Sequence, residues 1–299
     1  MLGFSKLRKL MYMPVYLSRL LYWELYSRFH DTITFSTIQG NFTVSCKDQG
    51  IGKTLFGYKQ FEGNLIKETF LHLQSRGKIP ANGAGTIVDI GANIGVIGIG
   101  AVYMGLAKNI IAIEPDPNNF ILLTRNIQQN GLDDRSVCLP FAVAEQEGEL
   151  RFELSQDNFG DHRLHSDNLI SPGKELFDES NRQIIFVQSK PLDTIVKQLP
   201  DKFTNDISLI WMDVQGYEGY VFSSGQAFFK RGIPVMVEIW PYGVRRAGMR
   251  DEQFCGIVSG LWKEYWRLID GKFKRFPMET FQAFYTGLEY GQFENVIFE

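Results

Sequence analysis

Two acidic residues stand where two neighbouring strands are expected to end, and their setting favours a nucleoside site. The apolar run Thr86–Ile90 contains Asp89 and leads into a Gly-Ala-Asn-Ile-Gly turn, and a second apolar run ends in Glu114, which is 114 − 89 = 25 positions further on. Glycines let the backbone turn sharply beside a ligand, and a helix that follows offers unpaired N–H groups. An acid at the tip of the second strand can accept hydrogen bonds from both hydroxyls of a ribose.

The loop argues against two common nucleotide sites. It lacks the Gly-x-Gly-x-x-Gly pattern of dinucleotide-binding loops and the Gly-Lys-Ser/Thr of a P-loop. The carboxylate of Asp89 would repel a phosphate, but it would attract the cationic amino-acid end of S-adenosylmethionine. The residues therefore favour S-adenosylmethionine as the cofactor, and they disfavour a nicotinamide dehydrogenase.

The segments that must position these acids alternate between strand and helix. After strand Thr86–Ile90 the apolar pattern predicts helix Val96–Met104, strand Asn109–Glu114, helix Pro117–Asn130, strand Ser136–Ala142, helix Leu192–Leu199, strand Ile207–Asp213, helix Glu218–Phe222 and strand Pro234–Ile239. A last pair of strands, Phe281–Tyr285 and Asn295–Phe298, suggests an antiparallel edge. We expect an α/β fold with a Rossmann-like, doubly wound, mostly parallel sheet and an antiparallel edge strand pair.

Four acids fall at the ends of predicted strands, and they are Asp89, Glu114, Asp213 and Glu238. Ligands of such sheets lie beyond the carboxyl ends of the strands, at the point where the strand order reverses. The four acids are therefore expected to surround one site.

The chain divides on its pattern into two parts. Residues 1–56 are expected to form a helical arm and a hairpin, the hairpin lying at Ile33–Cys46, and residues 57–299 carry the site, with a polar insert at about 155–182. In the first thirty residues, basic side chains alternate with large apolar ones. This arm is either a basic amphipathic helix on an anionic membrane surface or a cover for the domain or for a second copy, and we favour the cover.

Composition narrows the classes of partner. The 299 residues carry a net charge of −3 and a pI near 5.9, which gives no reason to expect nucleic acid. Three separated cysteines form neither a CxxC site nor a disulfide framework, so a cytoplasmic location is expected, peripheral to the membrane if the arm binds lipid. No apolar run approaches the roughly 18 residues of a membrane span.

Several blocks together resemble the FkbM-type family of class I S-adenosylmethionine-dependent methyltransferases. They span roughly Gly57 to Trp240 and comprise Ile87–Gly95, Ile113-Glu114-Pro115, Arg125-Asn126, Asn130-Gly131, Leu192-Asp193-Thr194, Met212–Glu218 and Val237-Glu238. The Asp-Val-Gln-Gly-Tyr-Glu block is the specific one, whereas the glycine loop is common to most methyltransferases. The resemblance implies O-methylation of a hydroxyl on a sugar, glycan, polyketide or other small metabolite.

A set of cofactor residues follows from the motifs and from this resemblance. Asp89 and the loop backbone should hold the amino-acid end, Glu114 the ribose, and the small residue at the third strand end should let an adenine lie flat. Asn126 is either a helix-surface amide or a ligand-side residue. The full set is Asp89, Gly91, Asn93, Gly95, Glu114, Pro115, Asn126, Ala142 and Asp213.

A hydroxyl nucleophile needs a proton acceptor, and two residues are candidates. Asp213 is either a carboxylate beside the transferring methyl or the N-cap of the next helix, and both roles could hold. His162, in the insert, has an ordinary pKa suited to general base catalysis, although a solvated loop histidine is the alternative. Arg163 could clamp an anionic acceptor. Tyr217, Glu238 and Trp240 could line the acceptor pocket.

Two questions stay open on the sequence. Asp213 and Glu238 occupy strand ends that catechol-type O-methyltransferases use for a metal, but two acids do not make a Mg²⁺ site, and we assign no metal. An N-methyltransferase, a protein-directed enzyme, a silent nucleoside-binding scaffold and a homodimer are the remaining alternatives.

Overall fold

A twisted eight-stranded sheet forms the centre of the computed structural model, which describes residues 4–170 and 174–299 and the side chains of residues 13–170 and 174–299. Its order is β13-β12-β14-β11-β10-β3-β4-β5. The strands are β3 (Ala84–Ile90), β4 (Ala107–Ile113), β5 (Ser136–Leu139), β10 (Ile207–Met212), β11 (Val235–Ile239), β12 (Glu264–Ile269), β13 (Lys272–Pro277) and β14 (Glu294–Phe298). Strands β5, β4, β3, β10 and β11 are parallel, and β14, β12 and β13 form an antiparallel edge. The predicted Rossmann-like, doubly wound and mostly parallel sheet with an antiparallel edge is confirmed.

Helices cover both faces of this sheet, because its central strands are apolar on both sides. All seven residues of β3 are buried, with Ile87 facing one core and Val88 the other. Helices α3 (Gly63–Ser75), α4 (Val96–Tyr103) and α5 (Pro117–Gln129) pack on the first face. The opposite face carries α6 (Leu192–Gln198), α7 (Asp201–Thr204), α8 (Glu218–Ser224), α9 (Gln226–Phe229), α10 (Pro241–Arg246), α11 (Asp251–Leu261) and α12 (Phe281–Gly287).

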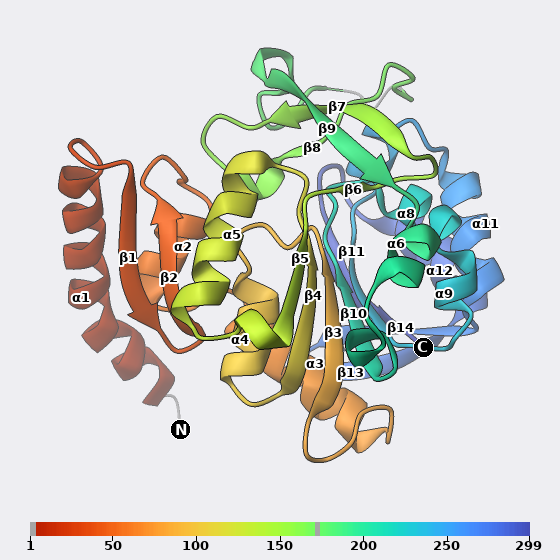
Figure 1. Cartoon of the computed structure of the whole chain (residues 1–299), viewed down its shortest axis with the longest axis horizontal. Coiled ribbons are helices and arrows are strands. Elements are labelled where there is room, and N and C mark those ends of the chain that lie inside the picture. Colours follow the sequence, from red (N-terminus) through yellow and green to blue (C-terminus); the bar gives the residue numbers. More distant parts are fainter. Residues whose placement is uncertain (1–3, 171–173) are drawn as a thin grey trace.

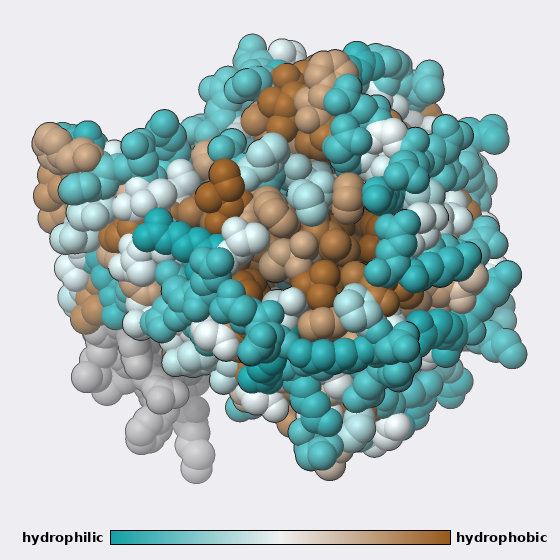
Figure 2. Space-filling model, viewed as in Figure 1, coloured by the Kyte–Doolittle hydropathy of each residue, from teal (hydrophilic) through white to brown (hydrophobic). Residues whose placement is uncertain are grey.

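The polar insert belongs to a second, four-stranded sheet of order β6-β9-β7-β8. Its strands are β6 (Ala142–Val143), β7 (Gly148–Leu154), β8 (Arg163–Leu164) and β9 (Gln183–Lys190). This small sheet lies across the carboxyl ends of the central strands (Figure 1). Figure 2 shows hydrophobic residues gathered below it, in the middle of the face where Figure 1 places β4 and β5. Residues 171–173 of the predicted insert lie outside the described residues.

The strand predicted at Ser136–Ala142 is wrong in its extent. Strand β5 ends at Leu139, and Ala142 starts β6 in the small sheet. Pro140 lies between them, and a proline has no N–H with which to continue a ladder of hydrogen bonds. The chain therefore changes sheets at this point.

The predicted strand at Phe281–Tyr285 is also wrong, because this segment is helix α12. Its fully buried aromatic residues, Phe281 and Tyr285, are four positions apart, which places them on one face of a helix. The antiparallel edge is instead formed by β14, which contains the predicted strand Asn295–Phe298, and by the hairpin β12–β13, which turns at Asp270-Gly271, where both residues have positive φ.

The N-terminal extension comprises α1 (Phe4–Tyr26), β1 (Thr32–Thr37), β2 (Gly40–Ser45) and α2 (Ile51–Tyr58), which confirms the predicted hairpin. Phe42 and Val44 of the hairpin share a core with residues of the central sheet. Helix α1 lies on the outer side of the hairpin and forms one end of the molecule (Figure 1). The division of domains at residue 56 stays a prediction. Within the described segments, no helix is both long and apolar enough to cross a membrane.

Asn126 joins the hairpin to the rest of the fold. Its fully buried amide accepts the N–H of Thr43 at 2.8 Å and donates to the carbonyls of Thr43 at 3.2 Å and of Ile94 at 2.9 Å. Each of these backbone groups would be left without a partner if the amide were removed. Asn126 is therefore a structural crosslink between β2, α5 and the loop before α4.

We expect Asn126→Ala to lower the free energy of unfolding by about 2–4 kcal/mol, because buried backbone groups lose their partners. Urea denaturation followed by circular dichroism measures this change. Gln128→Ala, at an exposed position of the same helix, is the matched control. Equal stabilities of the two variants would contradict the crosslink.

Candidate functional site

A pocket opens where β3, β4 and β10 end. The strand order reverses here, since β3 has β4 on one side and β10 on the other. Nine of the predicted site residues line this pocket, and they are Asp89, Gly91, Asn93, Glu114, Pro115, Ala142, His162, Asp213 and Tyr217. The structure thus brings most of the predicted cofactor residues together.

Gly91 lets the first strand end pass close to the fourth. It has φ +82°, and a Cβ atom there would lie 1.9 Å from the carbonyl oxygen of Asp213. The Asp213 N–H in turn donates to the Ile90 carbonyl at 3.0 Å. Any side chain at position 91 would push β10 away from β3 and open the floor of the pocket.

Gly95 has a packing role and does not line the pocket. Its φ is +88°, and a Cβ atom there would meet Leu123 at 2.7 Å and Ile99 at 2.8 Å. Asp89 accepts the N–H of Gly98, in the first turn of α4, at 3.0 Å. The second glycine of the loop therefore seats α4 against α5, and Asp89 receives one N–H group from the helix.

Glu114 is held between two backbone donors. One carboxylate oxygen accepts the N–H of Asn93 at 2.8 Å, and the other accepts the N–H of Asp116 at 2.8 Å. The side chain is 4% exposed and lines the pocket. Each oxygen of a carboxylate can accept a further hydrogen bond, so the geometry leaves room for two ligand hydroxyls.

Burial raises the pKa of every carboxyl group that lines the pocket. Desolvation, together with the charge of Asp213, raises the pKa of Asp89 to about 7. Desolvation and the neighbouring Asp116 raise the pKa of Glu114 to about 8, although backbone N–H groups oppose this shift. Desolvation also raises the pKa of Asp213 to about 6 and that of Glu62 to about 7, the latter with help from Asp213 and Asp89.

None of these four acids forms an ion pair with a lysine, arginine or histidine side chain among the residues described. Nearby Asp161 is paired with both Arg163 and Arg182. Charged groups are rarely buried unless they are paired. The pocket therefore gathers acids whose ionised form no basic side chain of the described residues stabilises, which agrees with their raised pKa values.

His162 lines the pocket from the insert, but it is not a free base. Its Nδ1 accepts the N–H of Ser155 at 3.0 Å, which assigns the ring proton to Nε2, 3.6 Å from Asp116 Oδ2. Burial, with the charge of Arg182, lowers the pKa of His162 to about 4. Because its basic nitrogen is occupied and its pKa is low, this arrangement argues against the predicted role of His162 as proton acceptor.

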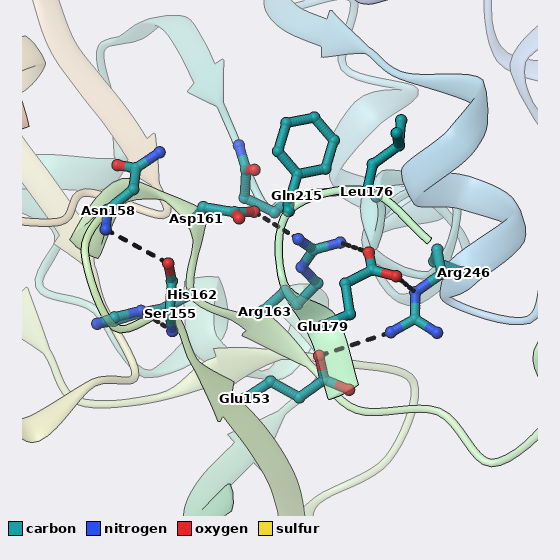
Figure 3. A network of polar contacts seen from close by, with 12 residues as sticks. Glu153, Ser155, Asn158, Asp161, His162, Arg163, Leu176, Glu179, Gln215 and Arg246 are labelled. Atoms are coloured by element: carbon teal, nitrogen blue, oxygen red, sulfur yellow. Dashed lines mark hydrogen bonds and ion pairs between the residues drawn. The ribbon is translucent and has the colours of Figure 1, made fainter. Parts of the chain in front are cut away.

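Arg163 does not reach the pocket. It is 3% exposed, and its two terminal nitrogens meet Asp161 at 2.7 Å and Glu179 at 2.9 Å. Figure 3 shows the chain of contacts continuing from Glu179 to Arg246 and from there to Glu153. Since both ends of its guanidinium group are occupied, Arg163 is not available to clamp an acceptor, and the pair of Glu179 with Arg246 joins the insert to α10.

The predicted acceptor residues separate into two groups. Tyr217 lines the pocket, whereas Trp240 is buried with its indole N–H donating to the Gly291 carbonyl at 3.3 Å. Glu238 does not line the pocket. Burial and the charges of Asp213 and Glu218 raise its pKa well above the ordinary value. Asn126 also lies outside the pocket, because its amide is used by the hairpin.

Among the pocket residues that were not predicted are Glu62, Asn119 and Phe159. Glu62 follows a break between α2 and α3 that the sequence pattern does not show, and it has φ +53°. Asn119 is buried with its side-chain oxygen unpaired, and its amide donates to the Phe159 carbonyl at 3.3 Å. The position of Asn119 in the first turn after Glu114 could have identified it, whereas no local signal identifies Phe159.

Among residues 13–170 and 174–299, no group of three or more His, Cys, Asp or Glu side chains is arranged to hold a metal ion. Asp213 and Glu238, the two strand-end acids to which no metal was assigned, thus acquire no third ligand from these residues.

Comparison with solved structures gives matches of low identity. A methyltransferase FkbM from Methylobacillus flagellatus is 16% identical, with a TM-score of 0.39, over 72% of this chain and 44% of that protein. A tRNA m1G37 methyltransferase from M. jannaschii is 21% identical over 37% of this chain and 29% of that protein, with a TM-score of 0.27. A precorrin-6y C5,15-methyltransferase from Geobacter metallireducens is 8% identical, with a TM-score of 0.36, over 78% of this chain and 87% of that protein. This chain thus spans less than half the length of the first of these proteins.

No curated protein sequence matches the chain. The sequence model of the methyltransferase FkbM domain matches residues 89–248. This segment is more than half of the chain, and it begins at Asp89 and includes Glu114 and Asp213. The resemblance seen in the sequence motifs is therefore confirmed, and this protein belongs to the FkbM methyltransferase family.

Proposed function

We propose that this protein is an S-adenosylmethionine-dependent methyltransferase that methylates a hydroxyl group of a sugar, a glycan or another small metabolite. The observation that carries the proposal is the set of unbalanced carboxyl groups at the end of β3, β4 and β10. When bound, the cofactor supplies a methyl group on a positively charged sulfonium. A cation is the ligand charge that this pocket favours.

The residues present fit the cofactor from end to end. Asp89 and the backbone of the loop at Gly91 and Asn93 are suited to the charged amino-acid end. Glu114, fixed by its two backbone donors, has acceptor capacity for the two ribose hydroxyls. Ala142 and its apolar neighbours Phe141 and Val143 line the pocket and would offer an apolar surface to a flat base.

Asp213 is the group we assign as proton acceptor. It lines the pocket, and Gln215 fixes its orientation by donating to its carboxylate at 2.6 Å. Burial raises its pKa to about 6, which is close to the range in which a general base works best at neutral pH. Tyr217 lies on the same rim and is suited to contact the acceptor.

Removing the Glu114 carboxylate should weaken binding of S-adenosylhomocysteine. Glu114→Ala is expected to lower the affinity by about 1.5–3 kcal/mol, roughly 10- to 100-fold, because the hydrogen bonds of Glu114 to the two ribose hydroxyls are lost. Titration calorimetry measures the affinity, and Glu147→Ala, at an exposed position, is the control. Unchanged affinity in a folded Glu114→Ala variant would sink the ribose assignment.

Stability should depend on pH in the direction set by the raised pKa values. The folded protein keeps protons on Asp89 and Glu114 up to pH of about 7 and 8, whereas an unfolded chain releases them near their ordinary values. Between these limits the folded state holds more protons, so the free energy of unfolding should fall by about 2 kcal/mol or more from pH 5 to pH 8. Denaturant unfolding across this range provides the test.

Glu114→Gln should flatten this pH dependence, since it removes one of the protons concerned. Glu252→Gln, at an exposed position of α11, should leave the pH dependence unchanged. A wild-type stability that rises with pH over this range would show that the pocket acids do not hold their protons.

Asp213→Asn should lower turnover by about a hundredfold or more, the usual contribution of a general base. In the wild type, turnover should fall below a pH of about 6, and this acidic limb should disappear in the variant. Methyl transfer from labelled cofactor to a panel of sugars and glycolipids measures both effects. His162→Asn is the comparison variant and should keep the limb. Loss of the limb in His162→Asn alone would return the role to the histidine.

A further inference from the structure

Helix α1 has an inner face that is fully engaged with the body of the protein. Trp23 is 1% exposed and packs against Phe56, with ring centroids 5.6 Å apart. Tyr16 stacks on Tyr58 at 4.3 Å, and Arg19 donates to the Gly57 carbonyl at 2.9 Å. These contacts fix the rotation of the helix about its axis and so determine which side chains face outward.

The outer face of α1 exposes a stripe of large apolar side chains. Met13, Leu17, Leu21 and Leu25 follow one another at intervals of four residues and are 52%, 55%, 63% and 52% exposed. Residues four apart lie above one another on a helix, so the stripe follows the helix axis. Flanking aromatic residues add to it, Tyr22 at 51% and Phe29 at 82% exposed. Figure 2 shows hydrophobic residues at this edge of the molecule, where Figure 1 places the last turns of α1.

The N-terminal segment that contains this helix differs in net charge from the rest of the chain. Residues 1–30 contain five basic residues and one acid, Glu24, for a net charge of 5 − 1 = +4. The remaining residues contain 31 − 5 = 26 basic and 34 − 1 = 33 acidic residues, for a net charge of −7. Positive charge is thus concentrated in the segment that exposes the apolar stripe, in a protein that is otherwise acidic.

We propose that the outer face of α1 lies in the headgroup region of an anionic lipid bilayer, with the helix parallel to the membrane plane. The apolar stripe would enter the boundary with the acyl chains, and the net positive charge of residues 1–30 would favour an anionic surface. The stripe and the excess of positive charge together favour this partner over a second copy, because two copies of the arm would bring like charges together. The acidic remainder of the chain would be repelled from the same surface, which leaves α1 as the contact.

Vesicle co-sedimentation of the full chain tests this surface. The wild type should bind vesicles that contain phosphatidylglycerol, bind pure phosphatidylcholine vesicles much less, and lose binding as salt is added. The variant Leu17→Glu/Leu21→Glu should bind the anionic vesicles at least about tenfold more weakly. Ile121→Glu/Phe186→Glu is the matched control, because both of these side chains are 63% exposed and lie on other elements, and it should bind as the wild type does apart from the effect of its added charge.

Three results would overturn the proposal. The first is a wild type that stays in the supernatant with anionic vesicles, and the second is an α1 variant that binds them as well as the control variant does. The third is a dimer, detected by light scattering, that binds no vesicles and that the Leu17→Glu/Leu21→Glu substitutions dissociate. This third result would assign the stripe to contact with a second copy. Circular dichroism of each variant shows whether the fold is retained.

Discussion

The central constraint in this structure is the burial of carboxyl groups without cations to balance them. Asp89, Glu114 and Asp213 come from three different strands, yet the parallel sheet brings their ends to one edge. Burial raises the pKa of each, and the nearby arginines are already engaged with Asp161 and Glu179. A pocket of this kind favours a cationic ligand, because the positive charge of the ligand stabilises the ionised form of the buried carboxyl groups.

The surrounding structure maintains this arrangement. Gly91 permits the ends of β3 and β10 to approach, which keeps Asp89 and Asp213 on one wall. The insert covers the pocket from the other side, where the Phe159 carbonyl accepts hydrogen bonds from the amides of Asn93 and Asn119. The paired charges around Arg163 then fasten the insert to α10. The ion pairs around Arg163 thus stabilise the position of the insert, whereas Asp89, Glu114 and Asp213 form no such pair among the described residues and can contact a ligand.

The sequence predicted the parts of the site that follow from local patterns. Apolar strands that end in an acid, and a glycine turn between a strand and a helix, suffice to place Asp89, Glu114 and Asp213 at one edge, because the geometry of a parallel sheet does the rest. Residues whose role depends on distant partners could not be predicted in this way. Arg163 and Asn126 have the chemistry of binding residues, but Glu179 and the hairpin occupy them. The pKa of His162 depends on burial that no local pattern encodes. The segment of helix α12 was predicted as one strand because aromatic residues favour strands, although the spacing of four between Phe281 and Tyr285 fits a helix.

The most direct test of the central claim is the proton balance of cofactor binding. Titration calorimetry with S-adenosylmethionine at pH 7, repeated in buffers with different heats of ionisation, counts the protons exchanged on binding. If a cation binds among carboxyl groups that hold protons at this pH, binding should release on the order of one proton, and the affinity should rise between pH 6 and pH 8. An enthalpy that is the same in all buffers, with an affinity that does not change with pH, would contradict the account.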